Sequence, residues 1–128
     1  MKNKVLIIED NEQNMYMLSF LLESYGYVVL KAFSGQEGIT SAKKEMPDII
    51  LLDIQLPEMD GYTVAKKLRE DEQILKTPII AVTSYAMPGD KEKVLAAGAT
   101  GYIEKPIDPD TFVSQMTSFL PPDFFDLE

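Results

Sequence analysis

The chain has 128 residues, of which 12 are basic and 21 acidic, and its formal net charge at pH 7 is −9. This charge argues against nucleic acid or an anionic membrane surface as a direct partner, and it suits metal cations or basic protein surfaces. The sequence contains no cysteine and no histidine, which excludes disulfides, thiolate zinc sites and a Ser-His-Asp triad, so any chemistry must come from carboxylates, hydroxyls and lysine.

Length and apolar patterning predict one soluble, cytoplasmic domain. A chain of this size buries roughly two thirds of its unfolded surface, which is enough for a core. No apolar run approaches the roughly 20 residues that span a bilayer, and "MKNK" leads directly into a strand-like run rather than the apolar region of a signal peptide. We expect a single domain over residues 1–120, an acidic C-terminal tail over residues 121–128 and no output domain.

Five short runs of β-branched and aliphatic residues predict five strands. In chain order they are "KVLII" (4–8), "YVVLKA" (27–32), "DIILLD" (48–53), "PIIAVT" (78–83) and "GYIEK" (101–105). Between them lie segments of roughly 10 to 16 residues with helical spacing. This alternation predicts βα repeats along the whole chain.

The first two helical segments have recognisable faces and ends. The first carries an apolar face and ends at Gly26, a typical helix-ending residue; that face consists of Met15, Leu18, Leu22 and Tyr25. The second begins with Ser34 and Glu37 at capping-box spacing and buries Ile39 and Ala42.

Three further helical segments follow. Gly61 lets the chain begin the third, which carries Val64 and Leu68, and the fourth extends from about Pro88 to Gly98. In the fifth, Asp108 is expected as N-cap and Pro109 as first helical residue. Its apolar face consists of Phe112, Met116 and Phe119 or Leu120, and Pro121 and Pro122 end it. The acidic aromatic tail that follows is expected to fray, with a docked or partner-binding tail as the alternative.

Five βα repeats predict an α/β fold with a doubly wound parallel sheet and helices on both faces. Parallel strands need crossover connections, and these are right-handed. Nearly continuous apolar strands fit a sheet that is buried on both faces. Ligands of such sheets bind beyond the carboxyl ends of the strands, so the polar residues there are the candidate site.

Polar side chains follow four of the five predicted strands, at the edge of the sheet where ligands bind. They are Glu9 and Asp10, Asp53, Thr83 and Ser84, and Lys105, which Pro106 follows. Taken singly, each is more often a helix-end charge, a cap or a turn residue, but their coincidence at one edge favours a site. Three adjacent carboxylates repel one another strongly and require protons or a cation. Oxygen ligands with room for water suit Mg²⁺, so this edge predicts a magnesium site.

A metal-bound aspartate beside a lysine and a hydroxyl is a plausible nucleophile toward a phosphoryl group. The metal and Lys105 would offset charge on the phosphoryl oxygens while Asp53 attacks in line. The product would be an aspartyl phosphate, a mixed anhydride that water can cleave. Such a state stores a signal for a limited time.

Four motifs, in their order and spacing, resemble the receiver domain of two-component response regulators. They are "LIIEDN", "DIILLDIQLPEMDG", "PIIAVTSYAM" and "GYIEKPI". The resemblance covers Lys4 to Leu120, and "EDNEQNMYML" and "TSYAM" resemble stand-alone receivers of the DivK and CheY-like type and receivers attached to hybrid kinases. It implies a flavodoxin-like (βα)5 fold with strand order 2-1-3-4-5.

The resemblance also implies the acceptor and the metal ligands. Asp53 would accept the phosphoryl group, and Asp10 and Asp53 would ligate Mg²⁺ directly, with Mn²⁺ as a substitute. The backbone carbonyl of Gln55 would be the remaining protein ligand, and Glu9 would act through water. The side chains of Gln55 and Tyr85 occupy positions that tune hydrolysis in the family.

Further residues are implied in catalysis and in the response. Thr83 would hydrogen-bond a phosphoryl oxygen and Lys105 would pair with it. Tyr102 occupies the aromatic position that turns inward on activation, so Thr83 and Tyr102 form the expected switch. The Lys105–Pro106 peptide bond is expected to be cis, which is otherwise rare.

The implied partners are a sensor histidine kinase or histidine phosphotransfer protein and one or more target proteins, with no nucleic acid or membrane. We expect a monomer or weak dimer that accepts phosphate from a phosphohistidine, changes conformation and acts by protein binding, catalysing only its own phosphorylation and dephosphorylation. The first helix near Asn14 to Leu18 would contact the kinase, and the region around Tyr102 would contact targets.

Three other functions remain as alternatives. A haloacid-dehalogenase-like phosphatase also uses a strand-end aspartate and Mg²⁺, but it needs a second aspartate where this chain has Gln55. A flavodoxin-like FMN carrier would need a hydroxyl-rich and glycine-rich phosphate loop after the first strand. A degenerate receiver that binds partners without phosphorylation does not fit the complete set of acids, threonine and lysine.

Overall fold

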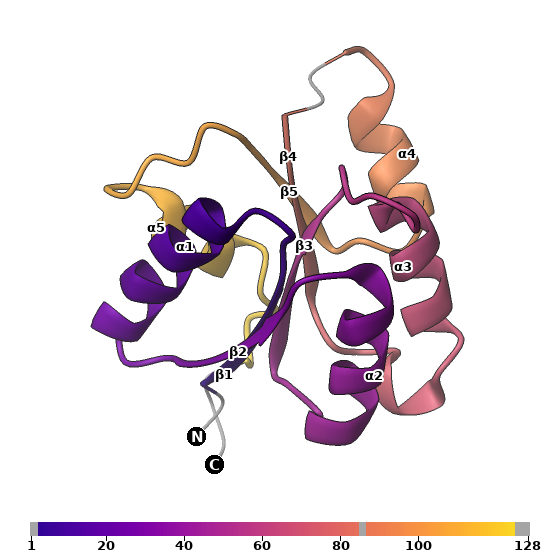
Figure 1. Cartoon of the computed structure of the whole chain (residues 1–128), viewed down its shortest axis with the longest axis horizontal. Helices are drawn as coiled ribbons and strands as arrows, with labels where there is room; N and C mark the ends of the chain where they lie inside the picture. Colours follow the sequence, from indigo (N-terminus) through magenta and orange to yellow (C-terminus); the bar gives the residue numbers. More distant parts are fainter. Residues whose placement is uncertain (1–2, 85–86, 125–128) are drawn as a thin grey trace.

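A five-stranded parallel sheet forms the centre of the computed structural model, which describes residues 3–84 and 87–124 (Figure 1). The strand order is β2-β1-β3-β4-β5, and the predicted flavodoxin-like arrangement is confirmed. The strands are β1 (Lys4–Ile8), β2 (Val28–Ala32), β3 (Ile49–Asp53), β4 (Ile79–Thr83) and β5 (Gly101–Glu104).

Helices cover both faces of the sheet, as Figure 1 shows. The helices α1 (Glu12–Ser24) and α5 (Phe112–Ser118) lie on one face. On the other face lie α2 (Gly35–Glu45), α3 (Gly61–Arg69) and α4 (Asp90–Ala96). A short 3-10 helix, η1 (Glu72–Ile74), follows α3 and contributes buried Ile74 to the same face. Among the described residues, no helix is both long and apolar enough to cross a bilayer.

The core consists of two apolar clusters, one on each face of the sheet. Side chains of a strand point alternately to the two faces, so Val5 and Ile7 of β1 pack with α1 and α5, whereas Leu6 and Ile8 pack under α2 and α3. All five residues of β3 and of β4 are buried. These continuous apolar runs are typical of central strands of a parallel sheet.

Two details of the predicted helices are wrong. Tyr25 is not on the buried face of α1: it is the C-terminal cap and is 58% exposed, and Gly26 follows it with a φ of 93°. Asp108 does not cap α5. Its side chain accepts a hydrogen bond from the backbone N–H of Asp110, only two residues on, and this local turn delays the helix, which begins at Phe112 after Thr111.

The described part of the C-terminal tail packs against the sheet instead of fraying. Phe124 is only 3% exposed and belongs to the cluster under α1 and α5, and its backbone N–H donates to the carbonyl of Pro121. Burying a phenyl ring contributes about 2 kcal/mol, which offsets part of the entropy cost of ordering the turn. The alternative of a docked tail therefore holds for residues 121–124.

The end of β3 places Asp53 at the edge of the sheet where ligands are expected. This strand pairs with β1 on one side and β4 on the other, and Asp53 lies beside Val82. The following loop returns closely, since the Gly61 N–H donates to the Ile54 carbonyl at 2.9 Å. A Cβ at Gly61 would lie 2.7 Å from the Asp53 carbonyl oxygen, so only glycine fits where α3 begins.

Candidate functional site

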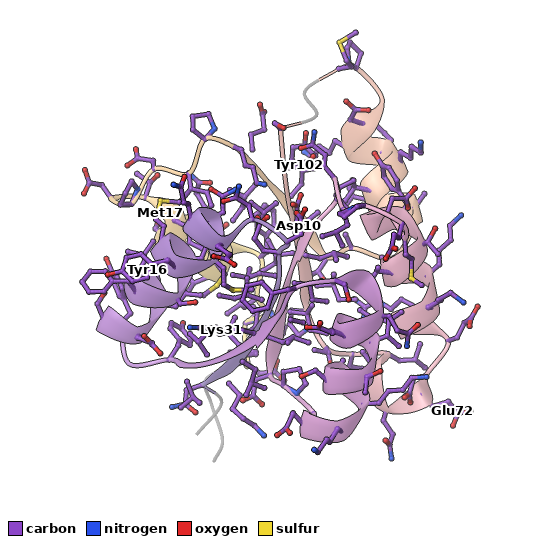
Figure 2. The ribbon with its side chains drawn as sticks, in the orientation of Figure 1. Asp10, Tyr16, Met17, Lys31, Glu72 and Tyr102 are labelled. Atoms are coloured by element: carbon purple, nitrogen blue, oxygen red, sulfur yellow. The ribbon has the colours of Figure 1, made fainter. Side chains whose placement is uncertain are left out.

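Three carboxylates meet at the carboxyl edge of the sheet. Glu9 and Asp10 directly follow β1, and Asp53 ends β3, which is the neighbour of β1. Each offers one oxygen, and these oxygens lie within 4.8 Å of one another. Glu9 and Asp53 are almost completely buried, whereas Asp10 is exposed. The predicted cluster is thus present, with two buried acids and one open to solvent. Figure 2 labels the exposed one, Asp10.

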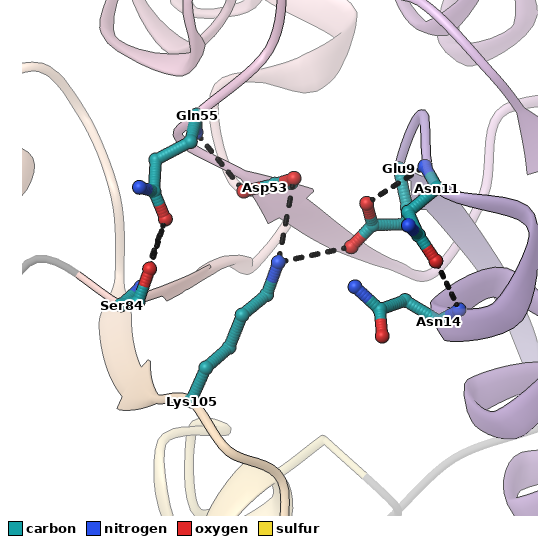
Figure 3. Close-up of polar contacts among 7 residues, drawn as sticks. All are labelled: Glu9, Asn11, Asn14, Asp53, Gln55, Ser84 and Lys105. Atoms are coloured by element: carbon teal, nitrogen blue, oxygen red, sulfur yellow. Dashed lines mark hydrogen bonds and ion pairs between the residues drawn. The ribbon is translucent and has the colours of Figure 1, made fainter.

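Lys105 supplies a positive charge to this cluster. Its ammonium nitrogen is 3.4 Å from an oxygen of Asp53 and 3.2 Å from an oxygen of Glu9 (Figure 3). Lys105 follows β5, its backbone N–H donates to the Thr83 carbonyl, and its peptide bond to Pro106 is cis. The contact with Asp53 places Lys105 beside the expected phosphoryl acceptor, but the contact with Glu9 was not predicted from the sequence.

The pKa of Glu9 is raised from 4.5 to about 7, mainly by burial. The neighbouring charge of Asp53 contributes to this rise, while the hydrogen bond from the Asn11 N–H and the charge of Lys105 oppose it. Three carboxylates beside a single ammonium therefore hold more negative charge than the site can neutralise, and a proton on Glu9 is one remedy. A divalent cation bound at the site is the other remedy for this excess negative charge. The donor set contains only oxygen atoms and fits Mg²⁺.

The two oxygens of Asp53 have different surroundings. One accepts a hydrogen bond from the backbone N–H of Gln55 at 2.9 Å, and the other faces Lys105. The Gln55 side chain extends to Ser84 at the end of the neighbouring strand, whose N–H and hydroxyl both donate to the Gln55 side-chain oxygen. The contact between Gln55 and Ser84 was not predicted, and the only signal for it was a hydroxyl at a strand end.

The two expected switch residues lie on neighbouring strands. Thr83 is fully buried at the end of β4. Tyr102 on β5 is half-buried and packs against the cluster under α2 and α3, and burial raises its pKa. Tyr102 also lines a cavity of about 760 Å³ together with Met87 and Pro88. Tyr85, the other residue expected to tune hydrolysis, lies outside the described residues.

Unfolding experiments on the metal-free protein can test the raised pKa of Glu9. The folded state holds a proton on Glu9 that the unfolded chain releases near pH 4.5, so the stabilisation is complete below pH 4.5 and is lost as the pH rises through about 7. We expect the free energy of unfolding, relative to Glu9→Gln, to fall by about 2 kcal/mol between pH 4.5 and 8. Urea denaturation of both proteins across this range measures the difference; parallel pH profiles would contradict the prediction.

The chain is similar to known proteins over nearly its whole length. The family model of the response regulator receiver domain matches residues 5–117. The polar-differentiation response regulator DivK of Brucella ovis is 43% identical over 120 residues, which cover 94% of this chain and 98% of that protein. The corresponding protein of Brucella anthropi is 42% identical over the same shares of both chains.

The chain is also similar to solved structures over nearly its whole length. The chemotaxis protein CheY4 of Vibrio cholerae is 33% identical with a TM-score of 0.89, and the match covers 94% of this chain and 100% of that one. The receiver domain of the sensor histidine kinase PA1611 from Pseudomonas aeruginosa is 33% identical with a TM-score of 0.84, covering 93% and 98% of the two chains. That structure has a magnesium ion coordinated in its active-site cleft.

Proposed function

Because the chain belongs to the response regulator receiver domain family of two-component signalling, we propose that Asp53 accepts a phosphoryl group from a phosphohistidine. Family membership implies a histidine kinase as partner, and a receiver of this type is not a conventional enzyme. The observation that supports Asp53 most directly is its position. It is buried at the end of the central strand, with one oxygen held by a backbone N–H and the other facing Lys105.

The proposed metal ligands are Asp10, Asp53 and the backbone carbonyl of Gln55, with Glu9 acting through water. Their support is the carboxylate cluster and the magnesium ion in the homologous receiver structure. A bound Mg²⁺ would offset charge on the phosphoryl oxygens. Two residues of the chain position the acceptor: the Gln55 N–H orients the Asp53 carboxylate, and Lys105 approaches its second oxygen.

In the proposed transfer, a lone pair of an Asp53 oxygen forms a bond to phosphorus. The bond between phosphorus and the imidazole nitrogen of the donor breaks, and its electron pair goes to that nitrogen. The added phosphoryl oxygens then require donors, and Lys105 and the Thr83 hydroxyl are proposed to supply them. Movement of Thr83 would open space that Tyr102 occupies on activation. Hydrolysis of the anhydride by water resets the domain.

Two surfaces are proposed for protein partners. On α1, Tyr16 and Phe20 are 71% and 65% exposed and their rings stack with centroids 6.3 Å apart, and Tyr16 lies on the outer side of the helix (Figure 2). Exposed aromatic pairs are typical of contact surfaces. Leu18, part of the segment expected to contact the kinase, is buried. The kinase or phosphotransfer protein is therefore proposed to contact Tyr16 and Phe20, and targets the cavity beside Tyr102.

Phosphorylation with a small-molecule donor tests the proposed function. Incubation with acetyl phosphate and Mg²⁺ is expected to add one phosphoryl group to the chain, detected by intact-mass spectrometry. Asp53→Asn should show no such addition, because the amide is not a nucleophile, and its unchanged circular dichroism would show that it is folded. The proposal fails if the wild type gains no mass, or if Asp53→Asn gains as much as the wild type.

A further inference from the structure

The side chain of Gln55 joins two loops at the edge of the sheet. Its carbonyl oxygen accepts hydrogen bonds from the backbone N–H of Ser84 at 3.1 Å and from the Ser84 hydroxyl at 2.5 Å. Gln55 lies two residues after Asp53, and Ser84 lies two residues after Val82, which pairs with Asp53. We call this pair of contacts the Gln55–Ser84 bridge. It connects the loop after β3 to the loop after β4.

The bridge lies next to the proposed acceptor. The backbone N–H of Gln55 donates to one Asp53 oxygen while its side chain binds Ser84, so a single residue contacts both. Figure 3 shows the bridge on one side of Asp53, and Glu9 on the other side, with Lys105 reaching toward both acids. Any group attached to Asp53 therefore arrives between the ammonium of Lys105 and the donors of Ser84.

An attached phosphoryl group would compete with Gln55 for these donors. It brings oxygens that share negative charge, whereas the Gln55 side chain offers a neutral amide oxygen. Hydrogen bonds to an ionised acceptor are roughly twice as strong as those between neutral groups. The N–H and hydroxyl of Ser84 would accordingly transfer from Gln55 to the phosphoryl group, and Ser84 would lose its connection to Gln55.

We propose that the Gln55–Ser84 bridge holds Ser84, the residue that directly follows β4, in the unphosphorylated conformation and must break when Asp53 is phosphorylated. Gln55 would then be a positioning residue that acts through Ser84, and the strength of the bridge would set how strongly the domain favours its resting state. This inference rests on the proposed function of Asp53. It assigns roles to the side chain of Gln55 and to Ser84 that are separate from metal binding.

A double-mutant cycle tests the bridge. Gln55→Met keeps the length of the side chain and leaves the backbone N–H and carbonyl in place, while Ser84→Ala removes only the hydroxyl. The probe is beryllium fluoride, which mimics a phosphoryl group on aspartate, titrated into the protein in saturating Mg²⁺ and followed by ¹H–¹⁵N spectra. We expect Gln55→Met to bind it about three- to ten-fold tighter, because weak exposed hydrogen bonds no longer have to break. We expect Ser84→Ala to bind it about two-fold more weakly, because the hydroxyl that would donate to the bound mimic is lost.

The effects of the two substitutions on beryllium fluoride binding should not be additive. Once Gln55 is methionine, Ser84→Ala should weaken binding more than it does in the wild type, because the Ser84 hydroxyl then gains the mimic without first giving up Gln55. The Ser84 amide of the resting protein should also exchange its hydrogen faster in Gln55→Met than in the wild type. Gln36→Met is the matched control: Gln36 is an exposed glutamine that bonds the Thr40 hydroxyl on α2, and its loss should leave beryllium fluoride binding unchanged.

The outcomes separate the two proposals. Equal or weaker binding of beryllium fluoride by Gln55→Met, or additive effects of the two substitutions, would overturn the role of the bridge alone. A wild-type chain that binds no beryllium fluoride in Mg²⁺ would overturn the proposed function together with the bridge. Tighter binding that depends on Ser84 supports the proposal.

Discussion

Replacing Lys105 with methionine is expected to lower the free energy of unfolding of the metal-free protein by about 2 kcal/mol at pH 8. The ammonium contacts oxygens of Glu9 and Asp53, both nearly buried. Removing one partner of a buried ion pair costs roughly 3–5 kcal/mol, and the 18% exposure of the Lys105 side chain reduces this figure. The decrease in the free energy of unfolding should be smaller at pH 5, where Glu9 takes up a proton.

Mg²⁺ should restore much of this lost stability, because a divalent cation can replace the missing ammonium charge. Urea denaturation of Lys105→Met at pH 5 and pH 8, with and without Mg²⁺, measures the effect. Lys105→Arg keeps the charge and serves as the control. Phosphorylation should produce a weaker conformational response in Lys105→Met than in the wild type. If Lys105→Met lost its affinity for Mg²⁺ instead, the assignment of Lys105 to the phosphoryl group rather than the metal would be wrong.

The Asp10→Asn variant is expected to bind Mg²⁺ on the order of 100-fold more weakly than the wild type, and to accept phosphate poorly for that reason. Asp10 is the exposed member of the carboxylate cluster, so replacing it with a neutral isostere creates no cavity and leaves no buried charge unpaired. Removal of a direct ligand should exceed the roughly 10- to 100-fold effect typical of residues that only support a ligand.

Calorimetric titration with Mg²⁺ measures this loss. The free energy of unfolding of Asp10→Asn should not fall, because one of three mutually repelling carboxylates has been neutralised. Asp123→Asn removes one negative charge from an exposed position in the tail, away from the cluster, and should retain the wild-type affinity. An Asp10→Asn protein with unchanged Mg²⁺ affinity would exclude Asp10 as a direct ligand.

Local sequence patterns were sufficient for the order and type of the elements. Each predicted strand contains the observed one with at most one extra residue. The extra residues are Tyr27 before β2, Asp48 before β3, Pro78 before β4 and Lys105 after β5. The errors lie at helix ends, where competing local bonds decide. The turn at Asp108 and the exposed cap at Tyr25 depend on the path of the chain that follows them. The spacing of apolar residues carries no information about that path.

The candidate site could be predicted as a set of residues but not as a set of contacts. Parallel strands bring their carboxyl ends to one edge, so Glu9, Asp10 and Asp53 were expected together. Which atoms meet depends on side-chain reach across strands, as in the contact of Lys105 with Glu9 and the Gln55–Ser84 bridge.

Arg69 shows the same limit of sequence patterns elsewhere in the fold. Its guanidinium donates to the backbone carbonyls of Gly98, Ile74 and Thr77 and so ties α3 to two loops. A lone arginine at the end of a helix carries no signal for such a role. The positions of the acceptors exist only after the chain has folded.

The separation of the core into two apolar clusters has a practical consequence for protein engineering. Among the described residues, the clusters have no member in common, and each borders different helices. Substitutions more than about 7–10 Å apart that share no partner usually add in free energy to within about 0.5 kcal/mol. A library that repacks the layer beneath α1 at such positions can therefore be screened independently of one that repacks the layer beneath α4. The best variants from each library can then be combined without a further search.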